Sequence, residues 1–154
     1  MTTYYLDTSA LSKRYVQETG TPWIRALVDP TVSHTLLLAR ITMVELYSAL
    51  ARRRREGTVP IEDYRVATQA FASHSATAYE FVELDLPVVE LGQALLERHP
   101  LRAYDAIQLA SALVANRVII SANLAALVFL SADDRLNSIA TVEGLLVDNP
   151  NIYT

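Results

Sequence analysis

Short apolar runs alternate with longer segments of helical periodicity along the whole chain of 154 residues. Strands are expected at residues 4–7, 32–38, 79–84, 127–130 and 145–147. Helices are expected at residues 8–16, 22–29, 43–56, 60–74, 87–98, 103–115 and 135–143, while residues 118–120 fit either state. Because strands that alternate with helices form parallel sheets with helices on both faces, the pattern predicts a three-layer α/β domain around a mostly parallel sheet of about five strands.

Composition restricts the number of domains and the chemistry available. A chain of 154 residues is about one domain long, so residues 1–154 are expected to form a single domain. Hydrophobic residues make up 51% of the chain and charged residues 19%, which indicates a globular protein with a large core. The absence of cysteine excludes disulfides, thiolate catalysis and sulfur-ligated zinc, so a bound metal must have oxygen or imidazole ligands.

The residues before Asp7 and the lengths of the apolar stretches indicate where the protein is located, and its charge bears on nucleic-acid binding. No basic segment precedes Asp7, and no apolar stretch approaches the roughly 18–20 residues of a membrane span. We therefore expect a soluble, unprocessed, cytoplasmic protein that does not contact a membrane. The net charge of −4 argues against a general nucleic-acid coat, although four consecutive arginines occupy positions 52–55.

Four acidic residues stand where predicted strands end or predicted helices begin: Asp7, Glu45, Asp105 and Asp133. In a parallel α/β sheet such positions lie along one edge, so we expect the four carboxylates to share a pocket. Two carboxylates about 4–5 Å apart repel by roughly 3–4 kcal/mol at an effective dielectric constant near 20, which calls for a shared proton or a bound cation. Oxygen-only ligands favour Mg²⁺ or Mn²⁺.

Two of these acids also have an ordinary structural explanation. Asp7 can cap a helix that starts at Thr8, where a carboxylate accepts unpaired amide protons. Glu45 fits a capping box that starts at Thr42, in which the glutamate reaches back to the amide of the cap residue. Glu45 also borders the apolar face of its helix, which would direct it toward a pocket instead.

Asp105 is harder to explain as a structural residue. It shares a narrow stripe with Gln108 and Ser111 on a helix that is apolar nearly all round and is expected to be buried. A buried carboxylate costs several kcal/mol unless it is paired or bound to a metal. The fourth acid is ambiguous, because Asp133 and Asp134 are adjacent and either could face the site.

Four motifs follow one another in order along the chain. They are Tyr5-Leu-Asp7-Thr-Ser-Ala-Leu-Ser-Lys13, Thr42-Met-Val-Glu45-Leu-Tyr-Ser-Ala-Leu, Tyr104-Asp105-Ala-Ile-Gln-Leu-Ala-Ser-Ala-Leu and Phe129-Leu-Ser-Ala-Asp133. Through these motifs nearly the whole chain resembles the PIN-domain nucleases, and within that group the VapC-type toxins of type II toxin–antitoxin pairs.

The resemblance implies a function and a set of site residues. It implies an endoribonuclease that uses Mg²⁺ or Mn²⁺ to hydrolyse phosphodiester bonds of tRNA or rRNA, a VapB-type antitoxin as partner, and a homodimer. The positions that match the family's acidic residues are Asp7, Glu45, Asp105 and Asp133, and those that match its supporting hydroxyls are Ser9 and Ser131. The sequence departs from the family pattern in the doubled aspartate at 133–134 and in serine at 131, where threonine is frequent.

The expected mechanism is attack by a metal-activated water, which leaves 5′-phosphate and 3′-hydroxyl ends. Basic residues near the acids are candidates for contacts with RNA phosphates: Lys13, Arg52 and Arg53. The alternative for the arginines is a solvated helix end that is stabilised by the helix dipole. Tyr47 and Tyr104 could stack on a base, but core packing is their expected role.

Two other functions remain open on the sequence. A non-catalytic interaction module with this fold would cleave no RNA. A phosphatase with Asp7 as nucleophile is disfavoured, because the second aspartate that such enzymes use is replaced by Ser9. Histidine-driven catalysis is not expected, because the histidines at positions 34, 74 and 99 share no motif.

Overall fold

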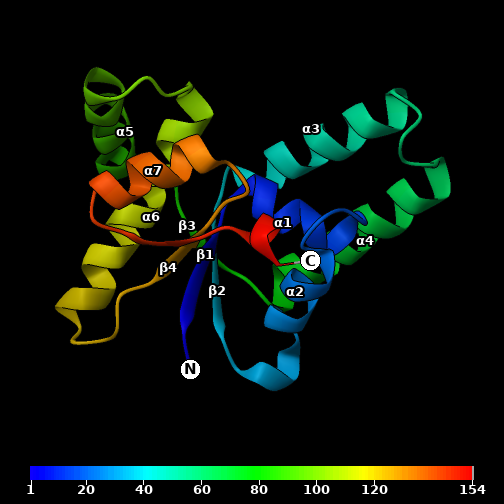
Figure 1. Ribbon diagram of the computed structural model, residues 1–154, viewed down its shortest axis with the longest axis horizontal. Coiled ribbons are helices and arrows are strands. Elements are labelled where there is room, and N and C mark those ends of the chain that lie inside the picture. The colour runs from blue at the N-terminus through cyan, green and yellow to red at the C-terminus, as the bar shows by residue number, and fades with distance from the viewer. Residues whose placement is uncertain (154) are drawn as a thin grey trace.

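The computed structural model describes residues 1–153 as five strands and seven α-helices, with two short 3₁₀ segments (Figure 1). The strands are β1 (Thr3–Leu6), β2 (Thr35–Ala39), β3 (Glu80–Val82), β4 (Val128–Leu130) and β5 (Leu146–Asp148). The helices are α1 (Thr8–Tyr15), α2 (Thr21–Leu27), α3 (Thr42–Arg55), α4 (Ile61–Thr77), α5 (Leu86–Arg98), α6 (Ala103–Ser121) and α7 (Asp134–Val142). The predicted alternation of strands and helices is confirmed.

All neighbouring strands in the sheet are parallel, and their order is β3-β2-β1-β4-β5. The register places Tyr5 of β1 beside Leu37 of β2 and Phe129 of β4. After β3 the chain crosses to the far side of β1, so the strand order reverses between β1 and β4. Ligands of parallel α/β sheets bind outside the carboxyl ends of the strands at such a reversal, which here lies beside Asp7.

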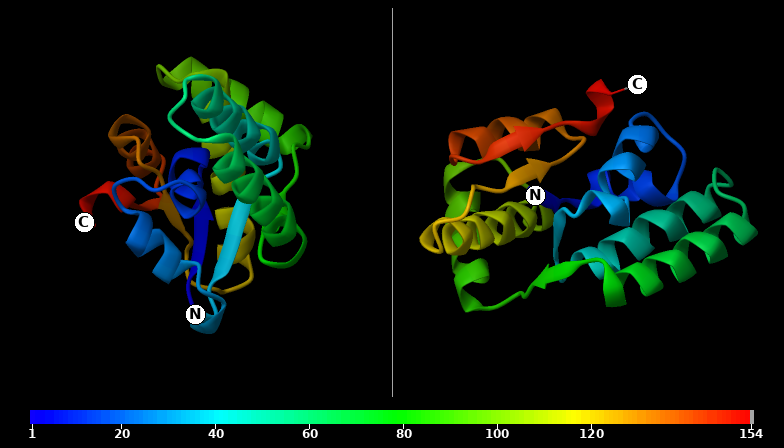
Figure 2. Two further views of the ribbon diagram at one scale, coloured as in Figure 1. Left: turned by 90° about the vertical axis from the view of Figure 1, so that its right-hand side faces the viewer. Right: turned by 90° about the horizontal axis from the view of Figure 1, so that it is seen from below.

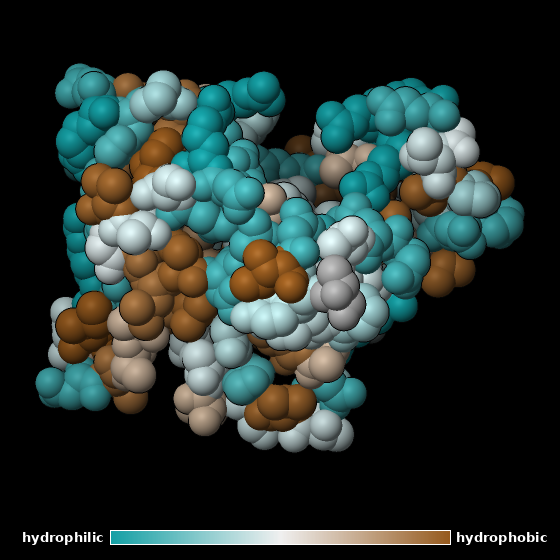
Figure 3. All heavy atoms as spheres, viewed as in Figure 1, coloured by the Kyte–Doolittle hydropathy of each residue, from teal (hydrophilic) through white to brown (hydrophobic). Residues whose placement is uncertain are grey.

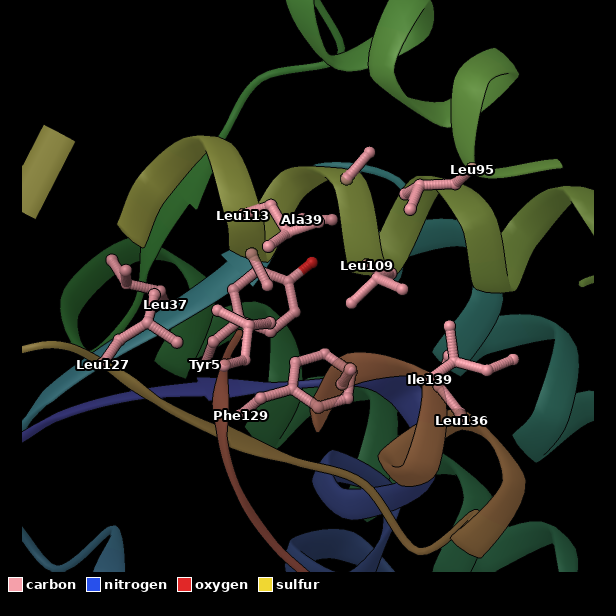
Figure 4. Packing of buried hydrophobic residues seen from close by; sticks show 14 of the residues in the cluster. Tyr5, Leu37, Ala39, Leu95, Leu109, Leu113, Leu127, Phe129, Leu136 and Ile139 are labelled. Carbon is pink, nitrogen blue, oxygen red and sulfur yellow. The ribbon is translucent and has the colours of Figure 1, made fainter. Parts of the chain in front are cut away.

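Side chains alternate between the two faces of the sheet and enter two separate cores. On one face Tyr5 and Phe129 are fully buried, their rings stack with centroids 5.6 Å apart, and they pack against residues of α5, α6 and α7 (Figure 4). On the other face Leu6 and Leu130 pack against residues of α1 to α4. The protein therefore has the three layers that the sequence predicts.

The longest helix extends beyond its expected end. The sequence predicts a helix over residues 103–115 and fits either state at 118–120, whereas α6 runs without a break from Ala103 to Ser121. Val118 is 66% exposed and Ile120 is 52% exposed, so these apolar residues lie on the surface of the last turns of the helix and not in a strand. The helix ends before Asn123, which adopts a positive φ of 58°.

The remaining helices define the outer shape of the molecule. α3 and α4 pack against each other and project away from the sheet, on the side opposite α5 and α6 (Figure 2).

The second strand begins later than the predicted range 32–38, because Pro30–Val32 forms a 3₁₀ turn and β2 begins at Thr35. Within residues 1–153, no helix combines the length and the apolar character that a membrane crossing requires.

Candidate functional site

All four predicted acids line one pocket of about 900 Å³. The pocket is bounded by α1, by α3 along most of its length, by the first turns of α6 and by the segment that follows β4, and its acidic end lies at the carboxyl ends of β1 and β4. In the space-filling view the surface is notched between the part that carries α5 to α7 and the part that carries α3 and α4 (Figure 3). Four segments that are distant in the sequence thus bring their carboxylates to one edge of the sheet.

Asp7 is the most buried of the four acids, with 5% of its surface exposed. Its Oδ1 accepts hydrogen bonds from Ser9 Oγ at 2.7 Å and from the Ala10 amide at 2.8 Å, and its Oδ2 accepts one from Ser131 Oγ at 2.6 Å. The pKa of Asp7 is raised to about 6, because burial and, to a smaller extent, the charge of the nearby Asp105 raise it by more than these three hydrogen bonds lower it. Asp7 therefore caps α1, as its structural explanation predicts, and also faces the pocket.

The two serines predicted as supporting residues join the ends of β1 and β4. In addition to binding Asp7, Ser9 Oγ accepts a hydrogen bond from the Ala132 amide at 2.9 Å. Ser131 is fully buried, and its Oγ accepts from the Asp133 amide at 3.1 Å. These hydroxyls fix the orientation of the Asp7 carboxylate and hold the segment that carries Asp133.

The capping-box explanation of Glu45 is wrong. The residue that caps α3 is Ile41, and Thr42 is the first residue of the helix. Glu45 instead lines the pocket, and its Oε2 accepts hydrogen bonds from Thr8 Oγ1 on α1 and from Gln108 Nε2 on α6, the latter at 2.7 Å. Burial raises the pKa of Glu45, these two hydrogen bonds lower it, and Asp105 raises it.

Gln108 joins three elements and was not predicted as a site residue. It is 3% exposed; its Nε2 also donates to Thr42 Oγ1 at 2.8 Å, and its Oε1 accepts from the Tyr5 hydroxyl at 2.8 Å. The polar stripe on the predicted helix was the signal that could have identified it. Gln108 orients the Glu45 carboxylate from α6.

Replacing Gln108 with leucine is expected to lower the free energy of unfolding by about 2–4 kcal/mol, because the buried hydroxyls of Tyr5 and Thr42 lose a partner. Urea denaturation measures the change. Gln93 is exposed on α5, so Gln93→Leu serves as the matched control and should change the stability by less than about 0.5 kcal/mol. Equal effects of the two substitutions would refute the assigned role of Gln108.

Asp105 is partly buried, not buried as its helix pattern suggested. It lies in the first turn of α6, where the helix reaches the mouth of the pocket. Desolvation and the charge of Asp133 raise its pKa, whereas Arg102 and Arg135 lower it. Since Asp105 also raises the pKa of Asp7 and of Glu45, it interacts electrostatically with all three other acids.

The structure distinguishes the two adjacent aspartates by position. Asp133 lines the pocket and caps α7, where its Oδ1 accepts hydrogen bonds from the amides of Arg135 and Leu136 at 2.9 and 3.1 Å. Both aspartates are exposed, but Asp134 does not line the pocket, and its Oδ1 accepts from Asn149 Nδ2 at 2.6 Å. Of the two, Asp133 is the one that faces the other acids.

The three predicted substrate-binding cations all line the pocket, but two are already paired. Lys13 is 4% exposed, and its Nζ lies 3.3 Å from Glu18 Oε1 and 2.8 Å from the Thr19 carbonyl. Arg53 Nη2 lies 2.8 Å from Glu18 Oε2. Glu18 thus compensates the charge of Lys13 and of Arg53 within the protein, whereas Arg52 is exposed.

The donor set of the pocket suits a hard divalent cation. Carboxylate and hydroxyl oxygens line the acidic end of the pocket. Burial and mutual repulsion raise the free energy of the ionised carboxylates, and a bound cation would lower it. Within the part of the chain that the structure describes, no three His, Asp or Glu side chains converge closely enough to chelate an ion by themselves. Mg²⁺ commonly takes one or two protein carboxylates and keeps several waters, so the arrangement fits such an ion.

Comparison with solved structures shows the same fold. A chain of VapBC2 from Rickettsia felis, solved with a DNA fragment from its promoter, matches with a TM-score of 0.64 at 12% identity over 96% of this chain and 98% of that chain. VapC20 from Mycobacterium tuberculosis, described as a toxin that cleaves the sarcin–ricin loop, matches with a TM-score of 0.62 at 16% identity over 93% and 96%. PAE2754 from Pyrobaculum aerophilum matches with a TM-score of 0.56 at 22% identity over 95% and 89%.

Comparison with protein families gives the assignment. The search of curated proteins found no match. The sequence model of the PIN domain matches residues 4–141, which include the segments that carry all four acids. Because this match spans most of the chain and agrees with the fold, the protein belongs to the PIN domain family.

Proposed function

We propose that the protein is a metal-dependent endoribonuclease that acts as the toxin of a toxin–antitoxin pair. The observation that carries the proposal is the convergence of Asp7, Glu45, Asp105 and Asp133 on one pocket of a PIN domain. Such a pocket suits hydrolysis of a phosphodiester, in which negative charge develops at phosphorus and at the leaving oxygen.

The four acids would hold Mg²⁺ or Mn²⁺, with Asp7 and Asp105 as direct ligands and Glu45 and Asp133 acting directly or through water. When bound, the ion supplies an activated water and stabilises charge on the leaving oxygen. Ser9 and Ser131 hold the Asp7 carboxylate in one orientation, and Gln108 and Thr8 hold that of Glu45. Positions that are fixed in this way reduce the reorganisation needed during the reaction.

Solved structures of similar fold support a substrate class and a partner for this proposal. VapC20 is described as cleaving the sarcin–ricin loop, which supports a structured cellular RNA such as rRNA or tRNA as the substrate. Similar chains come from VapBC and FitAB assemblies, which supports a VapB-type antitoxin as the partner. A homodimer is part of the same proposal.

Incubation of the purified protein with total cellular RNA tests the activity. We expect cleavage with Mg²⁺ or Mn²⁺, none with EDTA, and recovery when the metal is restored. Because water is the nucleophile, the products should carry 5′-phosphate and 3′-hydroxyl ends. Cleavage that persists in EDTA, or products with 2′,3′-cyclic phosphate, would contradict the mechanism, and no cleavage of any RNA would favour a non-catalytic interaction module.

A further inference from the structure

Tyr104 is an exposed aromatic residue at the mouth of the acidic pocket. Its sequence context suggested core packing, but the structure shows the side chain 60% exposed in the first turn of α6. It lines the same pocket as its neighbour Asp105. Burial within this domain therefore does not explain the aromatic ring.

Two apolar side chains, one on α3 and one at the position just before this helix, line the same pocket. Val44 is 71% exposed and Ile41 is partly buried, and both line the pocket together with Tyr104. A pocket built for a hydrated ion and phosphate alone would have no use for this apolar surface. Its presence indicates that part of the ligand is apolar.

Two arginines line the same pocket as these apolar side chains. Arg102 precedes Tyr104 by two residues, and Arg52 lies on α3; both are exposed and both line the pocket. Neither forms an ion pair with a residue in the described range 1–153. An aromatic ring and guanidinium groups that line one pocket match the parts of a nucleotide, which has an apolar base face and a charged phosphate.

We propose that Tyr104 is a stacking platform for one unpaired nucleobase next to the phosphate that is cleaved, with Val44 contributing to the same subsite. This inference rests on the proposed ribonuclease function. Stacking on a side chain requires a free base face, which a paired duplex does not offer. The substrate is therefore RNA that presents an unpaired nucleotide at the cleavage site, in a single strand or a loop.

Fluorescence anisotropy with a labelled single-stranded RNA in EDTA measures binding without cleavage. Tyr104→Ala should weaken binding by about tenfold, and Tyr104→Phe should stay within about twofold of wild type, because the ring stacks and the hydroxyl does not. Val118→Ala, at the exposed far end of α6, is the control and should bind as wild type does. A fully paired RNA of the same sequence should be bound equally by wild type and by Tyr104→Ala.

A second readout does not depend on the alanine variant. The only tryptophan of the chain is Trp23, so Trp23→Phe combined with Tyr104→Trp places a single tryptophan at the proposed subsite. Its fluorescence should be quenched when single-stranded RNA binds and should change little with duplex RNA.

The outcomes separate this inference from the ribonuclease proposal. Unaltered binding by Tyr104→Ala, or a loss that Tyr104→Phe shares, would overturn the stacking role even if the wild type cleaves RNA. Quenching by an acidic peptide but not by RNA would overturn it in favour of a protein ligand. Quenching by RNA, together with the tenfold loss for Tyr104→Ala, supports the subsite even if no cleavage is detected.

Discussion

Asp105→Asn should reduce the rate of RNA cleavage by at least about 100-fold in Mg²⁺. Asp105 interacts electrostatically with each of the other three acids, and its replacement removes one of the two direct metal ligands that we propose. Loss of a residue that merely supports a metal ligand costs roughly 10- to 100-fold, and loss of a ligand should cost more. Single-turnover cleavage of a labelled RNA measures the rate.

Asp134→Asn is the matched control for this experiment. Asp134 is an exposed aspartate that follows Asp133 and hydrogen-bonds to Asn149 outside the pocket. We expect its replacement to leave the cleavage rate within about twofold of wild type, because no reacting group is altered. A similar loss in both variants, or no loss in Asp105→Asn, would disprove the assignment.

Asp7→Asn should stabilise the protein at pH 7.5 in EDTA by up to about 3 kcal/mol. Burial raises the pKa of Asp7 from 3.8 to about 6, so the folded state favours the protonated carboxyl. Each pKa unit corresponds to about 1.4 kcal/mol, which sets the upper limit. The new amide can still accept from Ser9 and from the Ala10 amide and can donate to Ser131 Oγ.

The stability difference between Asp7→Asn and the wild type should depend on pH. The stability contributed by protonated Asp7 is fully present below pH 3.8 and is lost as the pH rises through 6, so the wild type should weaken over that range relative to Asp7→Asn. Urea denaturation at pH 5.0 and pH 7.5 should show a gain from the substitution that grows with pH. A gain that is constant, or a loss at pH 7.5, would contradict the pKa shift and its cause.

The sequence predicted the parts of the fold that depend on local pattern. Alternating strands and helices identified a parallel sheet, and the positions of Asp7 and Asp133 after β1 and β4 placed them at its carboxyl edge. That edge is a property of the topology, so residues far apart in sequence could be assigned to one pocket. Local pattern also explained correctly that Asp7 caps α1.

Features that depend on tertiary contacts could not be read in this way. Glu45 fits a capping box locally, but its partner Gln108 is 63 residues away. The sequence suggests that Lys13 could contact a phosphate, but in the fold Glu18, in the loop after α1, forms an ion pair with it. Core packing is the expected role of Tyr104 on the sequence, yet the first turn of its helix borders the pocket and leaves the side chain exposed.

Titration of Mn²⁺ into wild type, Asp7→Asn and Asp134→Asn by calorimetry tests most directly whether the clustered acids form one divalent-cation site. We predict saturable binding by the wild type and by Asp134→Asn, and binding at least about tenfold weaker by Asp7→Asn. Equal binding by all three proteins, or no saturable binding by the wild type, would contradict the account.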